Sequence, residues 1–159
     1  MALTTFDAIR EDQYTAIVGI TPTSMSGTRF VAAEEDADDF REWAAANPQA
    51  ALRRFTINEL GEEIDGPILD AARVFVTAEI VVAYPIAGKY GTPKRRMREK
   101  VMREDHAAIE AAAGVLGYGN IGPDCTVVGP PPPVQMETVG PVAFLTYTYR
   151  VAFTRDTGL

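Results

Sequence analysis

The sequence predicts a single α+β domain, a mostly antiparallel sheet packed on one face by two or three helices. Two long segments, Arg73–Pro85 and Pro141–Thr154, alternate in a way typical of strands, with one wholly apolar face in the first. Helical patterns are interspersed among the strands without a regular strand–helix alternation, which favours α+β over a doubly wound sheet. The length of 159 residues is usual for one domain.

The bulk composition is that of an ordinary globular protein, with 47% apolar and 23% charged residues. A net charge of −7 argues against general binding to nucleic acid or anionic membranes. The single cysteine excludes an internal disulfide framework and suits a reducing compartment. The N-terminus lacks a signal-peptide pattern, and no apolar run is long enough for a membrane span, so we expect synthesis in the cytosol and no membrane partner.

The first predicted element is a helix over Phe6–Val18. Thr5 suits its N-cap, and Asp7 lies in the first turn, where the positive end of the helix dipole favours a carboxylate. Gly19 and Pro22 are the residue types that end helices.

A loop-and-helix segment follows over residues 21–50. We expect a short strand at Arg29–Ala32 and then a helix that starts in the acidic run Glu34–Asp39 and stops before Pro48. The acidic run lacks the spacing and the glycine of an EF-hand loop, so no metal site is predicted.

The middle of the chain is predicted to form two strands. Arg54–Leu60 alternates as a half-buried strand does, and the glycine and acids of Gly61–Pro67 predict a turn. Arg73–Pro85 is long for a strand, so a bend or an extension beyond the domain is expected.

The last third is predicted to hold one helix and three strands. Apolar residues at 3.6-residue spacing predict a helix over Lys94–Leu116, and strands are expected at Thr126–Val128, Val134–Val139 and Pro141–Thr154. The prolines of Gly129–Pro133 predict a stiff spacer between two strands, with docking to an aromatic groove as the alternative.

No residue pattern predicts an enzyme. His106 is the only histidine and Cys125 the only thiol, and nothing around Cys125 matches a nucleophile motif. Neither a Walker loop nor a dinucleotide-binding glycine pattern is present, since Gly117–Gly122 follows a helix and suits its C-cap. We therefore predict no catalytic residue, no cofactor and no metal.

Asp105 is expected to fall in the apolar stripe of the predicted helix Lys94–Leu116. A buried carboxylate needs a partner, or its pKa rises. Three alternatives remain open: an intrachain partner, such as an arginine or a backbone amide, a contact to a neighbouring subunit, or a frayed or shifted helix geometry.

The strongest physical clue is the charge distribution. Between residues 89 and 103 only Glu99 opposes the basic residues Lys89, Lys94, Arg95, Arg96, Arg98, Lys100 and Arg103. The runs Glu34–Asp39 and Glu59–Asp65 are strongly acidic. Such patches are compatible with solvated faces, with copies meeting head to tail, or with a basic loop that faces DNA or an acidic protein.

The order of elements carries a family resemblance. A long strand ends at Tyr84-Pro85, a basic loop follows, a helix begins near Arg95 and holds Asp105, and the last strand contains Phe144–Val151. With the first helix, this layout over residues 55–156 resembles the tail terminator (tail completion) proteins of tailed bacteriophages and related head–tail neck proteins. The segment 21–50 matches no feature of that family and is interpreted as an insertion.

The resemblance implies a virion structural protein, made in the host bacterial cytoplasm and located in the tail or neck. Family members form hexameric rings that end tail-tube polymerisation and join the tail to the neck, so the implied partners are further copies, the tail tube protein and connector proteins. The predicted subunit or partner contacts are Lys89, Lys94, Arg95, Arg96, Arg98 and Asp105. The alternatives are another neck component, such as a head-closure or adaptor protein, or, from a different class, a small bacterial binding or enzymatic domain using Asp105, His106 and Cys125.

Overall fold

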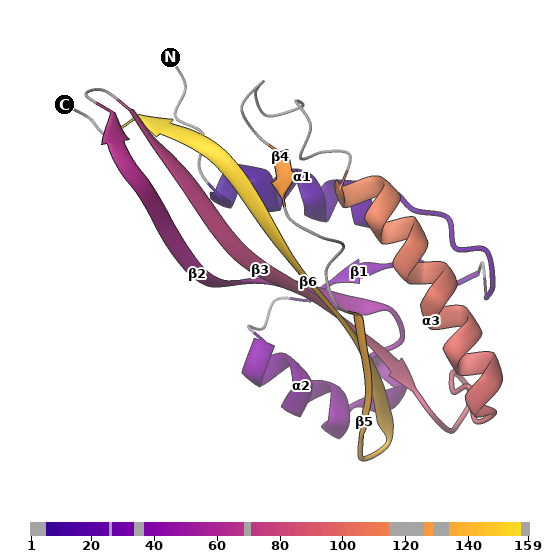
Figure 1. The fold of residues 1–159 in the computed structure, drawn as a ribbon. Helices are drawn as coiled ribbons and strands as arrows, with labels where there is room; N and C mark the ends of the chain where they lie inside the picture. Colours follow the sequence, from indigo (N-terminus) through magenta and orange to yellow (C-terminus); the bar gives the residue numbers. More distant parts are fainter. Residues whose placement is uncertain are drawn as a thin grey trace.

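The computed structural model confirms the α+β class. It describes residues 6–25, 27–33, 37–68, 71–114, 126–128 and 134–156. Within these ranges, three α-helices and a six-stranded sheet form the domain (Figure 1). Several predicted features lie outside the described residues: the N-cap Thr5, the acids Glu34–Asp36, the glycines Gly117–Gly122, Cys125 and the prolines of Gly129–Pro133.

The sheet is mostly antiparallel, as predicted, and its order is β1-β2-β3-β6-β4 with β5 also on β6. Among the described strands, only the short β1–β2 pair is parallel. β5 and β4 lie one after the other along the same edge of β6, at residues 142–147 and 150–152. The strands are β1 (Val31–Ala32), β2 (Arg54–Ile68), β3 (Ala71–Pro85), β4 (Thr126–Val128), β5 (Val134–Val139) and β6 (Val142–Asp156).

The predicted turn at Gly61–Pro67 is wrong, because β2 continues through it to Ile68. Glycine, proline and acids favour a turn locally, but β3 offers a long partner strand that pairs with β2 along its whole length. Register shifts between Glu59 and Gly61 and between Asp65 and Pro67 absorb the irregular residues as bulges. Pairing with β3 therefore overrides the local turn signal.

Two helices cover one face of the sheet, as predicted. They are α1 (Phe6–Val18), which keeps its predicted bounds, and α3 (Arg95–Ile109). α3 is shorter than the predicted helix because a π-helical turn, Glu110–Gly114, follows it. The main core lies between these helices and the sheet, where alternate residues of β3 and β6 are buried: Val74, Val76, Ala78, Ile80, Val82, Tyr84, Ala143, Leu145, Tyr147, Tyr149, Val151 and Phe153.

The third helix, α2 (Ala37–Ala46), lies on the opposite face of the sheet (Figure 1). Phe40 of this helix packs with Val81, Ala83 and Phe144, which point away from the main core. The second face of β3 is therefore buried at its C-terminal end, at Val81 and Ala83. The earlier residues of this face, Phe75, Thr77 and Glu79, are half-exposed. The segment 21–50 thus supplies both β1 and a second packing layer.

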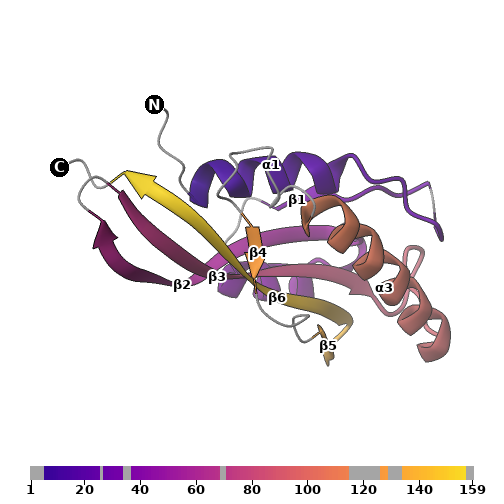
Figure 2. The ribbon, with the colours of Figure 1, turned by 45° about the horizontal axis from the view of Figure 1, so that its top comes forward.

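The domain is elongated along the three long strands. The C-terminal halves of β2 and β6 and the N-terminal half of β3 extend past the start of α1, while the first turn of α3 lies at the opposite end (Figures 1 and 2). The predicted extension of the long strands is thus present. The acidic stretch of β2 and the basic start of α3 consequently lie far apart within one chain.

Candidate functional site

Asp105 is buried and fully engaged within its own chain. Its two carboxylate oxygens accept hydrogen bonds from Arg53 Nε at 2.8 Å and a terminal guanidinium nitrogen at 3.1 Å, and the Tyr84 hydroxyl donates a third at 2.7 Å. Asp105 is 1% exposed and Arg53 0%. Burial and the adjacent carboxylate raise the pKa of Tyr84 well above its usual value. The structure therefore shows the intrachain-arginine alternative, and Asp105 is not available to a neighbouring subunit.

Arg53 ties this ion pair to the loop before β1. Its remaining guanidinium hydrogens go to the carbonyl oxygens of Ser24, Met25 and Thr28, at 2.7 to 3.0 Å. Arg53 also adopts a φ of 56°, a left-handed conformation that costs non-glycine residues about 1–3 kcal/mol. The charge-assisted contacts hold the residue in that conformation and fix α3 against the sheet.

His106 lies beside Asp105 in sequence but faces a different environment. Its ring packs against Tyr147 at 4.9 Å between centroids, and its Nε2 has no hydrogen-bond partner among the described residues. The Glu110 carboxylate is 3.9 Å away, beyond hydrogen-bonding distance. Since the Asp105 carboxylate is held by Arg53, an Asp–His pair is not formed, and Cys125 lies outside the described residues.

The environment of His106 predicts a measurable pH response. Burial lowers the pKa of its imidazole below 6.5, and the carboxylate of Glu110 partly opposes this shift. Because the folded-state pKa is depressed, the associated stability is present above pH 6.5 and is lost as pH falls through the folded pKa. An NMR titration of this single histidine should give a midpoint below 6.5, and Glu110→Gln should lower it further. A midpoint at or above 6.5 would contradict the assignment.

The basic residues gather at the start of α3, which we call the basic end. Lys94 is the N-cap residue without a side-chain cap bond, and the first turn holds no acidic residue. Basic side chains here are repelled by the positive end of the helix dipole, and each typically destabilises the helix by about 0.3–1 kcal/mol. The basic end comprises Lys89, Lys94, Arg95 and Arg96, which are exposed, and the partly exposed Arg98. Helix stability therefore does not account for this concentration of charge.

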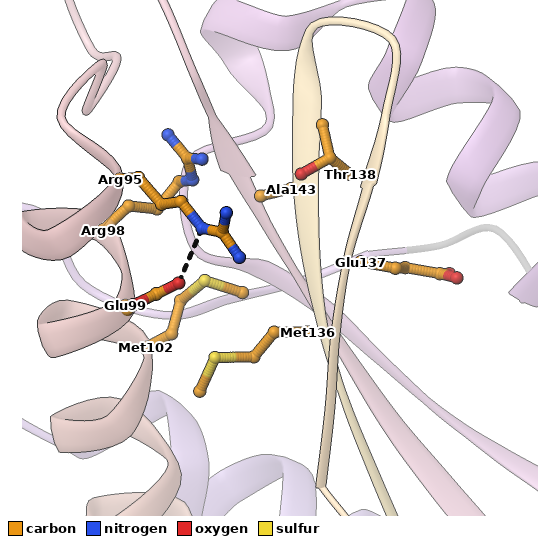
Figure 3. Close-up of a pocket in the computed structure, with 8 residues that line it drawn as sticks. All are labelled: Arg95, Arg98, Glu99, Met102, Met136, Glu137, Thr138 and Ala143. Atoms are coloured by element: carbon orange, nitrogen blue, oxygen red, sulfur yellow. Dashed lines mark hydrogen bonds and ion pairs between the residues drawn. The ribbon is translucent and has the colours of Figure 1, made fainter.

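A groove of about 320 Å³ opens between the basic end and the β5–β6 hairpin (Figure 3). The side chains of Met102 and Met136 lie close to each other on its two sides, and the guanidinium groups of Arg95 and Arg98 reach toward the hairpin from the helix. We call it the α3–β5 groove; it is lined by Arg95, Arg98, Glu99, Met102, Met136, Glu137, Thr138 and Ala143.

The charges of the α3–β5 groove are only partly neutralised within the chain. Arg95 Nε lies 2.9 Å from Glu99, one turn later on the same helix, and Arg98 donates to the Thr92 carbonyl oxygen at 2.9 Å. Glu137 points away from the groove (Figure 3) and lies 3.7 Å from Arg41, on the α2 side of the sheet. At its surface the groove therefore combines the exposed Arg95 and the partly exposed Arg98 with the thioether of Met136, whereas Met102 belongs to the buried core.

The sequence located part of this surface and missed the rest. It predicted the basic residues, which the structure brings together at one end, whereas Asp105 lies further along α3 in the interior. It missed Met102, Met136 and Thr138 as groove residues. Met136 alternates like any strand residue, and only the folding of the hairpin against α3 gives it this position.

Besides this groove, a hollow lined by Arg10, Glu11, Tyr14, Ala32 and Ala33 is found among the residues that the structure describes. The described residues contain no group of three or more metal-binding side chains, and none of their helices is long and apolar enough to cross a membrane. No protein-family model and no curated protein matches the chain.

Proposed function

We propose that this protein is a virion structural subunit, a tail terminator that forms a ring at the head-proximal end of a phage tail. The observation that carries the proposal is the basic end, where exposed cations crowd a helix start that they do not stabilise. A surface of this kind is favourable when an acidic surface of another subunit or component covers it.

The element order supports the assignment to this class. The long β3, the basic loop, α3 and the closing strand β6 follow the layout on which the resemblance rests. A sheet that extends past its helices offers further surface for contacts between copies. The ring would end polymerisation of the tail tube and present a face to the neck. A head-closure protein is the nearest alternative, because it would use the same kind of charged contact.

Reversing Arg95 and Arg96 to glutamate is expected to weaken association by at least about tenfold, because attraction to an acidic surface becomes repulsion. Mass measurement by light scattering over a concentration series would detect this change. In infected cells, the same variant should leave heads and tails unjoined or tails of irregular length, as counted by electron microscopy.

Arg10→Glu is a suitable control, since this residue is partly exposed on α1, where its guanidinium pairs with Asp7 and lies over the ring of Phe6, one turn earlier on the same helix. It should assemble as the unmodified protein does. Unchanged association and unchanged particle completion by a folded Arg95→Glu, Arg96→Glu variant would refute the proposed role of the basic end. Tails of irregular length favour the terminator, whereas tails of normal length that fail to join favour a head-closure protein.

A further inference from the structure

β5 lies at an edge of the sheet, and its outer side is open to solvent (Figure 1). Among the described strands it pairs only with β6. Residues 135–139 are all exposed, and Val134 is partly exposed. The strand reads Val-Gln-Met-Glu-Thr-Val, without proline or lysine, half of its residues are β-branched, and its single charge is Glu137. An open edge of this composition is a template for a further strand.

The other edge strands carry features that discourage the addition of a strand. β2 has four carboxylates and a proline between Glu59 and Pro67, and its register shifts twice in this region. Charges, proline and bulges are the usual means by which natural edges avoid pairing with another chain. β1 and β4 have only two and three residues. β5 keeps a continuous register over six residues, so it offers the longest edge without such protection among the described strands.

The turn between β5 and β6 determines which backbone groups of β5 point outward. Gly140, with a φ of 57°, and Pro141 form a two-residue turn. In such a hairpin the flanking residues, here Val139 and Val142, form a hydrogen-bonded pair. Hydrogen-bonded and non-hydrogen-bonded pairs alternate, so every second residue of β5 directs its amide and carbonyl groups away from β6. These residues are Val134, Met136 and Thr138.

We propose that the outer edge of β5 pairs with β5 of a second copy of this chain, antiparallel and centred on Met136. In this register Met136 lies opposite Met136 of the second copy, Val134 opposite Thr138, and Gln135 opposite Glu137. All three outward-pointing residues then enter hydrogen-bonded pairs. The contact is two-fold and joins copies in pairs. It uses no residue of the basic end, so it does not rest on the proposed ring.

The register is self-complementary on both faces of the sheet. Met136 is 40% exposed and borders the α3–β5 groove of about 320 Å³, so two thioethers can pack together at the two-fold axis. On the opposite face, the Gln135 amide donates to the Glu137 carboxylate of the second copy. Glu137 lies 3.7 Å from Arg41, beyond hydrogen-bonding distance. Because each Glu137 faces an amide, no like charges lie opposite each other.

Cross-linking of single cysteines tests the register. In a Cys125→Ser background, Met136→Cys should link to itself, because hydrogen-bonded antiparallel Cα atoms lie about 5.5 Å apart and disulfides span about 4.4–6.8 Å. Val139→Cys is the matched control, since Val139 is 45% exposed on the same strand. Its two copies would lie about 20 Å apart at about 3.4 Å per residue. Oxidation should therefore give about tenfold more covalent dimer from Met136→Cys.

Two measurements test the contact without cysteines. Met136→Lys places two ammonium groups opposite each other and should weaken pairing at least about fivefold in sedimentation experiments, whereas Val139→Lys should leave it unchanged. In the unmodified protein, NMR-detected exchange of the Met136 and Thr138 amides should slow as protein concentration rises. The Glu137 amide already bonds to β6, so its exchange should not depend on concentration in this way.

Equal yields of covalent dimer from Met136→Cys and Val139→Cys would overturn the contact. So would exchange of the Met136 and Thr138 amides that is independent of concentration, or unchanged pairing by Met136→Lys. Circular dichroism of Met136→Lys and Val139→Lys should match that of the unmodified protein, because both positions are exposed and substitutions there should preserve the fold. Lost pairing in a folded Met136→Lys protein then reports on the β5 edge itself.

Discussion

Replacing Asp105 with alanine is expected to lower the free energy of unfolding by about 3–5 kcal/mol. The substitution leaves the guanidinium of Arg53 buried at 0% exposure without its counter-ion, and it removes the acceptor of the Tyr84 hydroxyl. A domain of ordinary stability has only about 5–15 kcal/mol in total, so this loss is severe. Urea denaturation followed by circular dichroism would measure it.

Two further variants make the Asp105 prediction specific. Tyr84→Phe removes only one of the three hydrogen bonds and should cost about 1.5–3 kcal/mol, as hydrogen bonds to charged groups do. Glu99→Ala breaks an exposed ion pair with Arg95 on the same helix and should cost about 0.3–0.5 kcal/mol. A cost for Asp105→Ala no larger than that of Glu99→Ala would show that the buried pair is dispensable.

The Arg53–Asp105 ion pair is separate from the residues that line the α3–β5 groove. Arg53 precedes β2, Asp105 belongs to α3 and Tyr84 is the penultimate residue of β3, so the network joins the helix to the sheet further along α3 than the basic end. Charge reversals at the exposed Arg95 and Arg96 leave this network in place. Assembly defects in those variants can therefore be separated from unfolding by comparing urea midpoints.

Replacing Phe144 with alanine is expected to cost about 3–5 kcal/mol, the usual range for a fully buried phenylalanine. The ring is 0% exposed, and it packs edge-on against Phe40 of α2 with 6.2 Å between ring centroids. The cavity would open between the sheet and α2, on the face opposite α1 and α3. Amide hydrogen exchange should consequently rise in residues 37–46 more than in residues 6–18.

Val139→Ala serves as the matched control, because Val139 lies on the paired strand of the same hairpin and is 45% exposed. Its cost should stay within about 0.5 kcal/mol. Should α2 keep its exchange protection in a Phe144→Ala protein that is destabilised as expected, the second packing layer would not depend on this contact.

Local pattern in the sequence was sufficient for most of the elements. The predicted bounds of α1 and β5 agree with the structure, and glycines and prolines marked where several elements end. It failed at residues 61–67, where composition favours a turn. Pairing of a strand depends on what lies beside it in space, and only β3 makes this segment a strand.

The basic end was likewise visible in the sequence, since neighbours in a helix turn stay neighbours in the fold. Three other features depended on tertiary structure because they join residues far apart in the chain: Arg53 as the partner of Asp105, α2 on the opposite face, and Met136 opposite Met102. Many arginines could have met that aspartate, and the sequence predicted the need for a partner without indicating which one. By itself, then, the sequence determined the α+β class and the concentration of positive charge at one helix start. Tertiary packing alone decided that Asp105 belongs to the interior, and that a groove lies beside the charge, because both require distant segments to converge.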